Sequence, residues 1–213
     1  MVLVGVLALV AVVSPVVTPS GWAASDDARA DLLHRLERGV ETTWAMTTRF
    51  HRDTPAGPLD ANLQQINRQP DWLTAGFGSV RGVWNGRSID CANAPGGKLC
   101  GPGSAVEPTA GARASLAALR TATGRRGTEQ VRSDGSVRAA GRRGRCFSVR
   151  PRHFRAARDT TTEYCLTTDG IPLRVGVKRP DSSDIATART IRTTVTDADF
   201  TRLLRGYPIG TTP

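Results

Sequence analysis

The sequence lacks the short motifs by which most metal sites and enzymes are recognised. Its cysteines form the patterns Cys91-x8-Cys100 and Cys146-x18-Cys165, which do not match the close spacings of structural zinc ligands. No Cys-x-x-Cys redox motif, Gly-x-Ser-x-Gly nucleophile elbow or phosphate-binding glycine loop is present. We therefore expect a protein that is not an enzyme and that holds neither a metal nor a cofactor.

Lysine is scarce, so the formal net charge of +10 comes almost entirely from arginine. Thirteen arginines lie between residues 111 and 158, against two acidic residues in the same block. Such a block can contact an anionic polymer or anionic lipid head groups, or it can simply face solvent. The candidate anion contacts are Arg142, Arg143, Arg145, Arg150 and Arg152.

Aromatic residues are also few, at 5% of the chain. A surface that stacks nucleic acid bases needs several aromatic side chains among its arginines, but only Phe147 and Phe154 lie in the basic block. We therefore do not expect nucleic acid as the main partner. Binding of an anionic polymer, either nucleic acid or a cell-wall polymer, through residues 111–158 is an alternative function.

Charged side chains are absent from residues 1–24, and acidic residues follow at once. An apolar run over residues 2–17, followed by small residues, indicates a secretory signal peptide or, alternatively, an uncut membrane anchor. No cysteine precedes Cys91, so there is no lipoprotein attachment motif. We expect an exported protein at the cell envelope, with one domain over residues 25–213.

An even number of cysteines outside the cytoplasm is typical of disulfides. Four cysteines allow three pairings, and the spacing favours Cys91 with Cys100 and Cys146 with Cys165, since each pair belongs to adjacent predicted strands.

Hydrophobic periodicity predicts an α+β domain. Ser25 can cap a helix over residues 26–38 that ends at Gly39, and a period of two over residues 40–50 predicts a half-buried strand. We treat residues 72–84 as one segment, residues 111–121 as a short helix and residues 124–144 as irregular. Four further strands are predicted at residues 146–150, 163–167, 173–178 and 186–195, joined by short turns. Such short connections produce an antiparallel sheet, here curved, with helix packed on one face.

Several segments together resemble a known family. QPDWLTAGFGSVRGVWNGRSIDC, CFSV, EYCLTTDGIPLRVGV and TIRTTVTDADF resemble segments of uncharacterised exported or lipid-anchored proteins of high-GC bacteria, whose fold is similar to that of the LolA and LppX/LprG lipoprotein carriers. The resemblance covers most of residues 26–200. It implies a half-closed antiparallel sheet with one or two helices on its concave face, and a cavity that holds acyl chains.

The expected function is therefore binding of a hydrophobic or amphiphilic, lipid-like ligand. The candidate wall of the cavity consists of apolar residues from the early strands: Trp44, Met46, Phe50, Leu73 and Phe77. The arginine block is expected near the mouth of the cavity. A membrane-anchored sensor domain is a further alternative.

Overall fold

The computed structural model describes residues 25–95, 97–101, 116–155 and 158–207. The predicted signal or anchor at residues 1–24 lies outside these ranges. Helices and strands follow in the order α1 (Asp26–Glu41), β1 (Trp44–Asp53), β2 (Leu59–Arg68), β3 (Asp71–Gly76), β4 (Ser79–Trp84), β5 (Arg87–Ala94), β6 (Gly97–Cys100), β7 (Glu129–Ala139), β8 (Arg142–Pro151), β9 (Thr161–Leu166), β10 (Pro172–Lys178), β11 (Ser183–Arg192) and α3 (Asp197–Leu204). Residues 116–122 are also helical.

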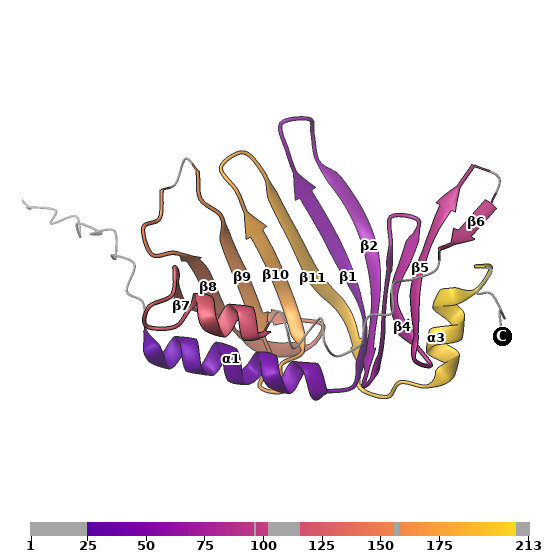
Figure 1. Cartoon of the computed structure of the whole chain (residues 1–213), viewed down its shortest axis with the longest axis horizontal. Helices are drawn as coiled ribbons and strands as arrows, with labels where there is room; N and C mark the ends of the chain where they lie inside the picture. Colours follow the sequence, from indigo (N-terminus) through magenta and orange to yellow (C-terminus); the bar gives the residue numbers. More distant parts are fainter. Residues whose placement is uncertain (1–24, 96, 102–115, 156–157, 208–213) are drawn as a thin grey trace, which may run out of the picture.

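All the described strands belong to one antiparallel sheet in the order β6-β5-β4-β3-β2-β1-β11-β10-β9-β8-β7 (Figure 1). The two end strands of this order, β6 and β7, do not pair with each other, so the sheet formed by the described strands does not close into a barrel. The predicted fold class is thus confirmed. Among the described helices, none has the length and hydropathy that a membrane-spanning segment needs.

The helix α1 begins and packs as the sequence predicts. The hydroxyl of Ser25 accepts a hydrogen bond from the backbone N–H of Ala28 (3.2 Å), which satisfies one of the free donors of the first turn. Ala28, Leu32 and Leu33 form its buried stripe. The predicted end at Gly39 is wrong, since the helix continues to Glu41.

Gly39 serves close packing instead. A Cβ atom there would lie closer than 3.0 Å to the backbone of Gly170, in the turn between β9 and β10. Only glycine lets the two backbones approach this far.

Two regions form hairpins that the sequence reading missed. Residues 72–84 fold into β3 and β4 around a turn at Phe77 and Gly78, whose φ angles are +51° and +73°. Residues 124–144, predicted to be irregular, contain most of the β7–β8 hairpin, which turns at Ala140 and Gly141 (φ +49° and +73°). Consecutive positive φ angles are typical of tight hairpin turns.

The helices α1 and α3 pack on opposite faces of the sheet. Phe147 lies in the cluster beneath α1. Direct strand pairing connects Phe147, through one residue on each of β9, β10 and β11, with Phe50 of β1, so Phe50 lies on the same face of the sheet. Ala45, an odd number of residues before Phe50 on β1, faces the other way and packs in the cluster with Phe200 of α3. The face opposite to α1 is therefore covered by α3, a helix that the sequence analysis did not predict. Residues 116–122 lie beside α1, where Arg29 donates to Thr123 (3.2 Å).

Two disulfides join neighbouring strands, with the pairing that the spacing favours. Cys91 of β5 bonds Cys100 of β6, and Cys146 of β8 bonds Cys165 of β9. Glu163 lies beside the second pair, so the three side chains are close enough to hold a metal ion. Both sulfur atoms are already in the covalent bond, however, and lack the thiolate that a metal binds.

Asp199 caps α3 and is buried. Its carboxylate accepts from the backbone N–H of Thr196 (3.0 Å) and forms ion pairs with Arg192 and Arg202 (2.8 Å each). The hydrogen bond from Arg192, followed by that from Thr196, lowers the pKa of Asp199 to about 2. Because this pKa is depressed on folding, the carboxylate stabilises the fold fully above its unfolded pKa near 4 and loses this effect as the pH falls through 2.

Asp199→Asn is therefore expected to lower the free energy of unfolding by about 1–2 kcal/mol at pH 7, after allowance for the solvent exposure of both arginines. Asparagine keeps an oxygen that can accept the capping hydrogen bond, so the loss of stability reports the removal of the negative charge alone. Thermal unfolding at pH 7 and at pH 2.5 measures the difference, which should shrink at the lower pH. An equal difference at both pH values would contradict this assignment.

Candidate ligand-binding site

A long hollow lies on the face of the sheet that carries α1. It consists of two adjoining parts of about 550 Å³ and 370 Å³, which share the lining residues Gln65, Pro172 and Val175. We call the two parts together the groove. Volumes in this range are typical of sites for small molecules.

The larger part lies between α1 and the centre of the sheet. Leu36 and Val40 of α1 form one wall, and the sheet supplies Trp44, Trp72, Tyr164, Leu166 and Val175. The smaller part continues along the strands over Met46, Thr48, Phe50, Leu63, Val177 and Ala186. The groove thus combines residues from β1, β2, β3, β9, β10 and β11.

Polar contacts hold the end of α1 over the groove. The side-chain amide of Asn67 donates to the carbonyl oxygens of Gly39 (3.3 Å), Val40 (3.3 Å) and Thr42 (2.7 Å). Gln69 donates to the Val40 carbonyl as well. Carbonyl groups at the end of a helix have no hydrogen-bond donor within the helix. The two side-chain amides supply these donors and so hold the wall of the groove in place.

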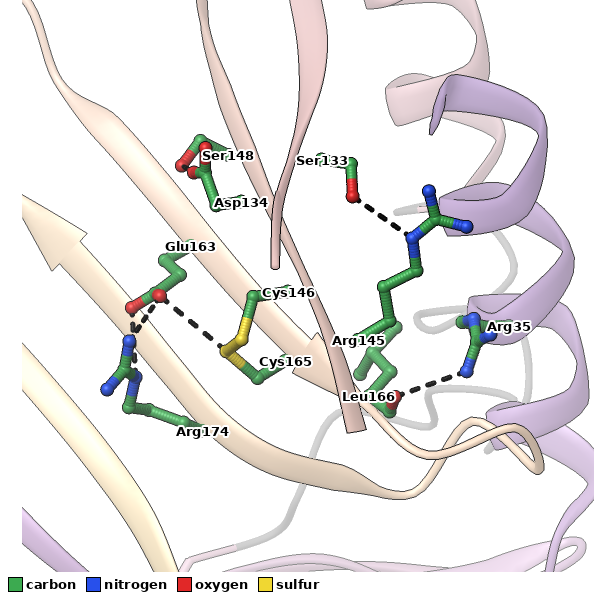
Figure 2. The surroundings of a disulfide bond; sticks show 10 residues. All are labelled: Arg35, Ser133, Asp134, Arg145, Cys146, Ser148, Glu163, Cys165, Leu166 and Arg174. Atoms are coloured by element: carbon green, nitrogen blue, oxygen red, sulfur yellow. Dashed lines mark hydrogen bonds and ion pairs between the residues drawn. A yellow bond between two sulfur atoms is a disulfide. The ribbon is translucent and has the colours of Figure 1, made fainter. Parts of the chain in front are cut away.

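On the other side, α1 is tied to the end of β9. Arg35 donates to the carbonyl oxygen of Leu166 (3.3 Å), as Figure 2 shows, and Arg38 pairs with Asp169 (3.1 Å). The helix is therefore anchored at both sides of the larger part.

The groove is almost free of charge. No charged residue is among the described residues that line its larger part. Arg174 and Asp184 border the smaller part, but Arg174 pairs with Glu163 and Asp184 pairs with Arg52. Burial, with a smaller contribution from Glu129, raises the pKa of Tyr164, so its hydroxyl stays neutral. Such a lining favours apolar groups.

The structure brings three of the five candidate wall residues to the groove. Trp44 lines the larger part, and Met46 and Phe50 line the smaller part. Leu73 borders the larger part, although its side chain is fully buried with the cluster beneath α3. Phe77 is 58% exposed and packs edge-on against Phe50, with 5.3 Å between ring centroids.

Sequence reasoning missed the lining residues of the later strands. Tyr164 and Val175 come from β9 and β10 and reach the groove only through the pairing of β1 with β11. The alternation of apolar residues in EYCL and PLRV indicates a buried face, but not which earlier strand it meets.

The five candidate anion contacts lie on β8 and just after it: Arg142, Arg143, Arg145, Arg150 and Arg152. None of them lines the groove in the part of the chain that the structure describes. Arg145 is held within the fold by Asp31 (2.8 Å), and Arg152 donates to the carbonyl oxygens of Gly127 and Gly124 (2.7 and 2.8 Å).

Arg143 and Arg145 border a separate polar hollow of about 540 Å³ together with Arg35, Ser133 and Ser136. Arg150 lies over the ring of Phe154, with its guanidinium carbon 4.6 Å from the centroid. The expected position of the arginines near the mouth of the groove stays a prediction.

No family model and no curated protein matches the sequence. Similar solved structures include MucB (19% identity, TM-score 0.48), the lipoprotein LppX of Mycobacterium tuberculosis (13%, 0.46) and LprF of Mycobacterium bovis (10%, 0.47). They cover 81%, 81% and 82% of this chain, and 60%, 99% and 97% of their own. The chain thus spans about 60% of the length of MucB. Similarities this low carry no argument about function.

Proposed function

We propose that the protein binds a hydrophobic or amphiphilic molecule in the groove. The observation that carries this proposal is the larger part of the groove, about 550 Å³ in volume, with no charged residue in its described lining. Two tryptophans and a tyrosine contribute to that lining. Each methylene group that leaves water for such a surface contributes about 0.8 kcal/mol, so an acyl or similar chain gains affinity with length.

We also propose that binding takes place outside the cytoplasm. Two disulfides are typical of proteins that fold in an oxidising compartment. Sequencing the amino terminus of the mature protein tests export, and a cut between the uncharged segment at residues 1–24 and α1 is the expected result.

Filling the groove with a larger side chain tests whether the groove is the binding site. Val175 lines both parts, so Val175→Trp is expected to fill the junction between them and to lower the affinity for an apolar ligand at least tenfold. Ile185→Trp is the matched control, because Ile185 is exposed on the opposite face of the neighbouring strand β11. Binding of the uncharged dye N-phenyl-1-naphthylamine, followed by fluorescence titration, measures both variants.

Circular dichroism should show that each variant remains folded, and Ala186→Phe provides a second obstruction in the smaller part. If the dye binds Val175→Trp as well as the unchanged protein, the groove is not the site. If neither the dye nor any co-purified amphiphile binds the unchanged protein, the proposed function itself is wrong.

A further inference from the structure

Arginines from two elements meet at the polar hollow beside α1 and the β7–β8 hairpin. This hollow, about 540 Å³ in volume, is lined by Arg35 of α1 and by Arg143 and Arg145 of β8. A second hollow of about 360 Å³ shares Ser136 and Arg143 with it and adds Arg138. We call the two together the arginine hollow. Its described lining contains no acidic residue and has no residue in common with the groove.

The guanidinium groups of Arg35 and Arg145 meet at one carboxylate. Asp31 of α1 lies 2.7 Å from Nε of Arg35 and 2.8 Å from Nη1 of Arg145. Arg145 also donates to the hydroxyl of Ser133 (3.0 Å), and Figure 2 shows its side chain reaching from β8 toward α1. The side chain of Arg145 is still 48% exposed, so a ligand that enters the hollow can contact it.

A bulge in β7 directs two serine side chains to the same side of the hairpin. Ser133 pairs with Phe147 and Ser136 with Arg145, and these two residues of β8 share a face of the sheet. Without the extra residue, side chains three positions apart on one strand would point to opposite faces. Ser133 accepts from Arg145 and Ser136 accepts from Arg143 (3.4 Å), but neither hydroxyl donates to a described residue. Both hydroxyl protons are therefore free to bind an acceptor.

The positive charge of the arginine hollow exceeds what the described residues neutralise. Arg138 and Arg143 pair directly across the hairpin, and neither forms an ion pair with a described residue. Like charges in this position destabilise a hairpin. Asp134 lies in the bulge, but it accepts from Ser148 on the opposite face (Figure 2). Among the described residues, Asp31 is thus the one carboxylate that pairs with any of the four arginines.

We propose that the arginine hollow binds a phosphate group, which belongs either to a small free phosphate compound or to a lipid head group. Several guanidinium N–H groups and two hydroxyls surround the hollow, and such a set of donors suits an anion with several acceptor oxygens. A phosphate monoester carries a charge of about −1.5 to −2 at pH 7, so it offsets more of the positive charge than a carboxylate does. The site does not depend on the proposed function, because it lies outside the groove.

Isothermal titration calorimetry of the full-length protein with inorganic phosphate and with acetate, at pH 7.5 and low salt, tests the site. Phosphate is expected to bind at least tenfold more tightly than acetate, because it forms more charge-assisted hydrogen bonds. Arg143→Gln should weaken phosphate binding about tenfold, the effect of one such bond, and Ser136→Ala about threefold. Circular dichroism should show that both variants remain folded.

Arg142→Gln is the matched control. It removes the same charge at the adjacent position of β8, but Arg142 faces the other side of the sheet and lines neither hollow. This variant should change the affinity for phosphate less than about twofold, the effect of a distant exposed charge. The proposal is overturned if phosphate does not bind, if acetate binds equally well, or if Arg142→Gln and Arg143→Gln weaken binding to the same extent.

Two further ligands identify the source of the phosphate group. Equal affinities for glycerol 1-phosphate and for the soluble lipid dihexanoyl phosphatidic acid would indicate a free phosphate compound. Tighter binding of the lipid that Arg143→Gln also weakens would indicate a lipid head group. Binding of N-phenyl-1-naphthylamine in the groove should be unchanged in Arg143→Gln, so a failure of the phosphate site is distinguished from a failure of the groove.

Discussion

Removing the disulfide between Cys146 and Cys165 is expected to lower the free energy of unfolding by about 3 kcal/mol, because the bond closes a loop of roughly twenty residues in the unfolded chain. The two cysteines are 19 positions apart and 3% and 0% exposed. Replacing both by alanine avoids burying new polar atoms, and the lost sulfur contacts add to the cost. Urea unfolding of the double variant, compared with the unchanged protein, measures the loss.

The other disulfide supplies the matched comparison. Cys91 and Cys100 are only 9 positions apart, so the same double substitution should cost about 0.6 kcal/mol less in loop entropy. A loss below 1 kcal/mol for Cys146 and Cys165 would contradict the expectation.

Ligand binding should survive the loss of this disulfide at temperatures where the variant is folded. Figure 2 shows Cys146 and Cys165 beside Glu163 and Arg174, while Arg145 points toward α1 on the other side of the strands. The groove lies on the α1 face, so the disulfide stabilises the sheet that carries the groove without contacting the ligand.

Gly170→Ala is expected to lower the free energy of unfolding by about 2–4 kcal/mol, since it combines backbone strain with overpacking. Gly170 has a φ of +78°, and a Cβ there would lie closer than 3.0 Å to the carbonyl oxygen of Arg35 and to Gly39. A shift of α1 away from the turn would also weaken the hydrogen bonds that Arg35 and Thr42 donate to the backbone of Leu166 and Asp169.

Gly141→Ala separates the two contributions. Gly141 has a similar φ of +73°, but open space surrounds the position of its Cβ. It should therefore lose only about 1 kcal/mol, the cost of the left-handed conformation. Thermal unfolding of both variants gives the difference. Equal losses would mean that the close approach of α1 to the turn contributes little.

Gly170 also borders the larger part of the groove. The alanine variant is consequently expected to bind the apolar dye less tightly even where it remains folded, because α1 must shift to admit the new methyl group.

Local patterns were sufficient to predict much of the fold. The cap at Ser25, the apolar stripe of α1 and the alternation in β1 are contained in adjacent residues, so the sequence predicts them directly. The disulfide pairing followed from short hairpins in the same way.

The misses have physical causes. Phe77 occupies a positive φ angle, which a bulky residue rarely adopts, so the turn between β3 and β4 is indicated only by the flanking Gly76 and Gly78. The strand β7 lies at the edge of the sheet with few buried residues and carries little apolar alternation. Gly39 ends a helix in most sequence contexts, and its close approach to Gly170 depends on a turn about 130 residues later in the chain.

The candidate site was predictable only in part for a related reason. Trp44, Met46 and Phe50 share a face of one strand, which the period of two reveals. The opposite wall depends on β1 pairing with β11, and that pairing brings residues at least 130 positions apart into register. Sequence periodicity specifies faces, but it does not specify partners.

Among the described strands, the open sheet leaves two edges without a partner strand, where another chain could add a strand and begin to aggregate. At one edge, β6 has only 4 residues and is covalently held to its neighbour through Cys100. At the other, β7 is interrupted by a bulge between Ser133 and Ser136 and carries the charged pair Arg132 and Asp134. A short strand, a bulge and edge charges are the means by which sheets resist self-association. The features of β6 and β7 are therefore expected to keep other chains from adding a strand at either edge.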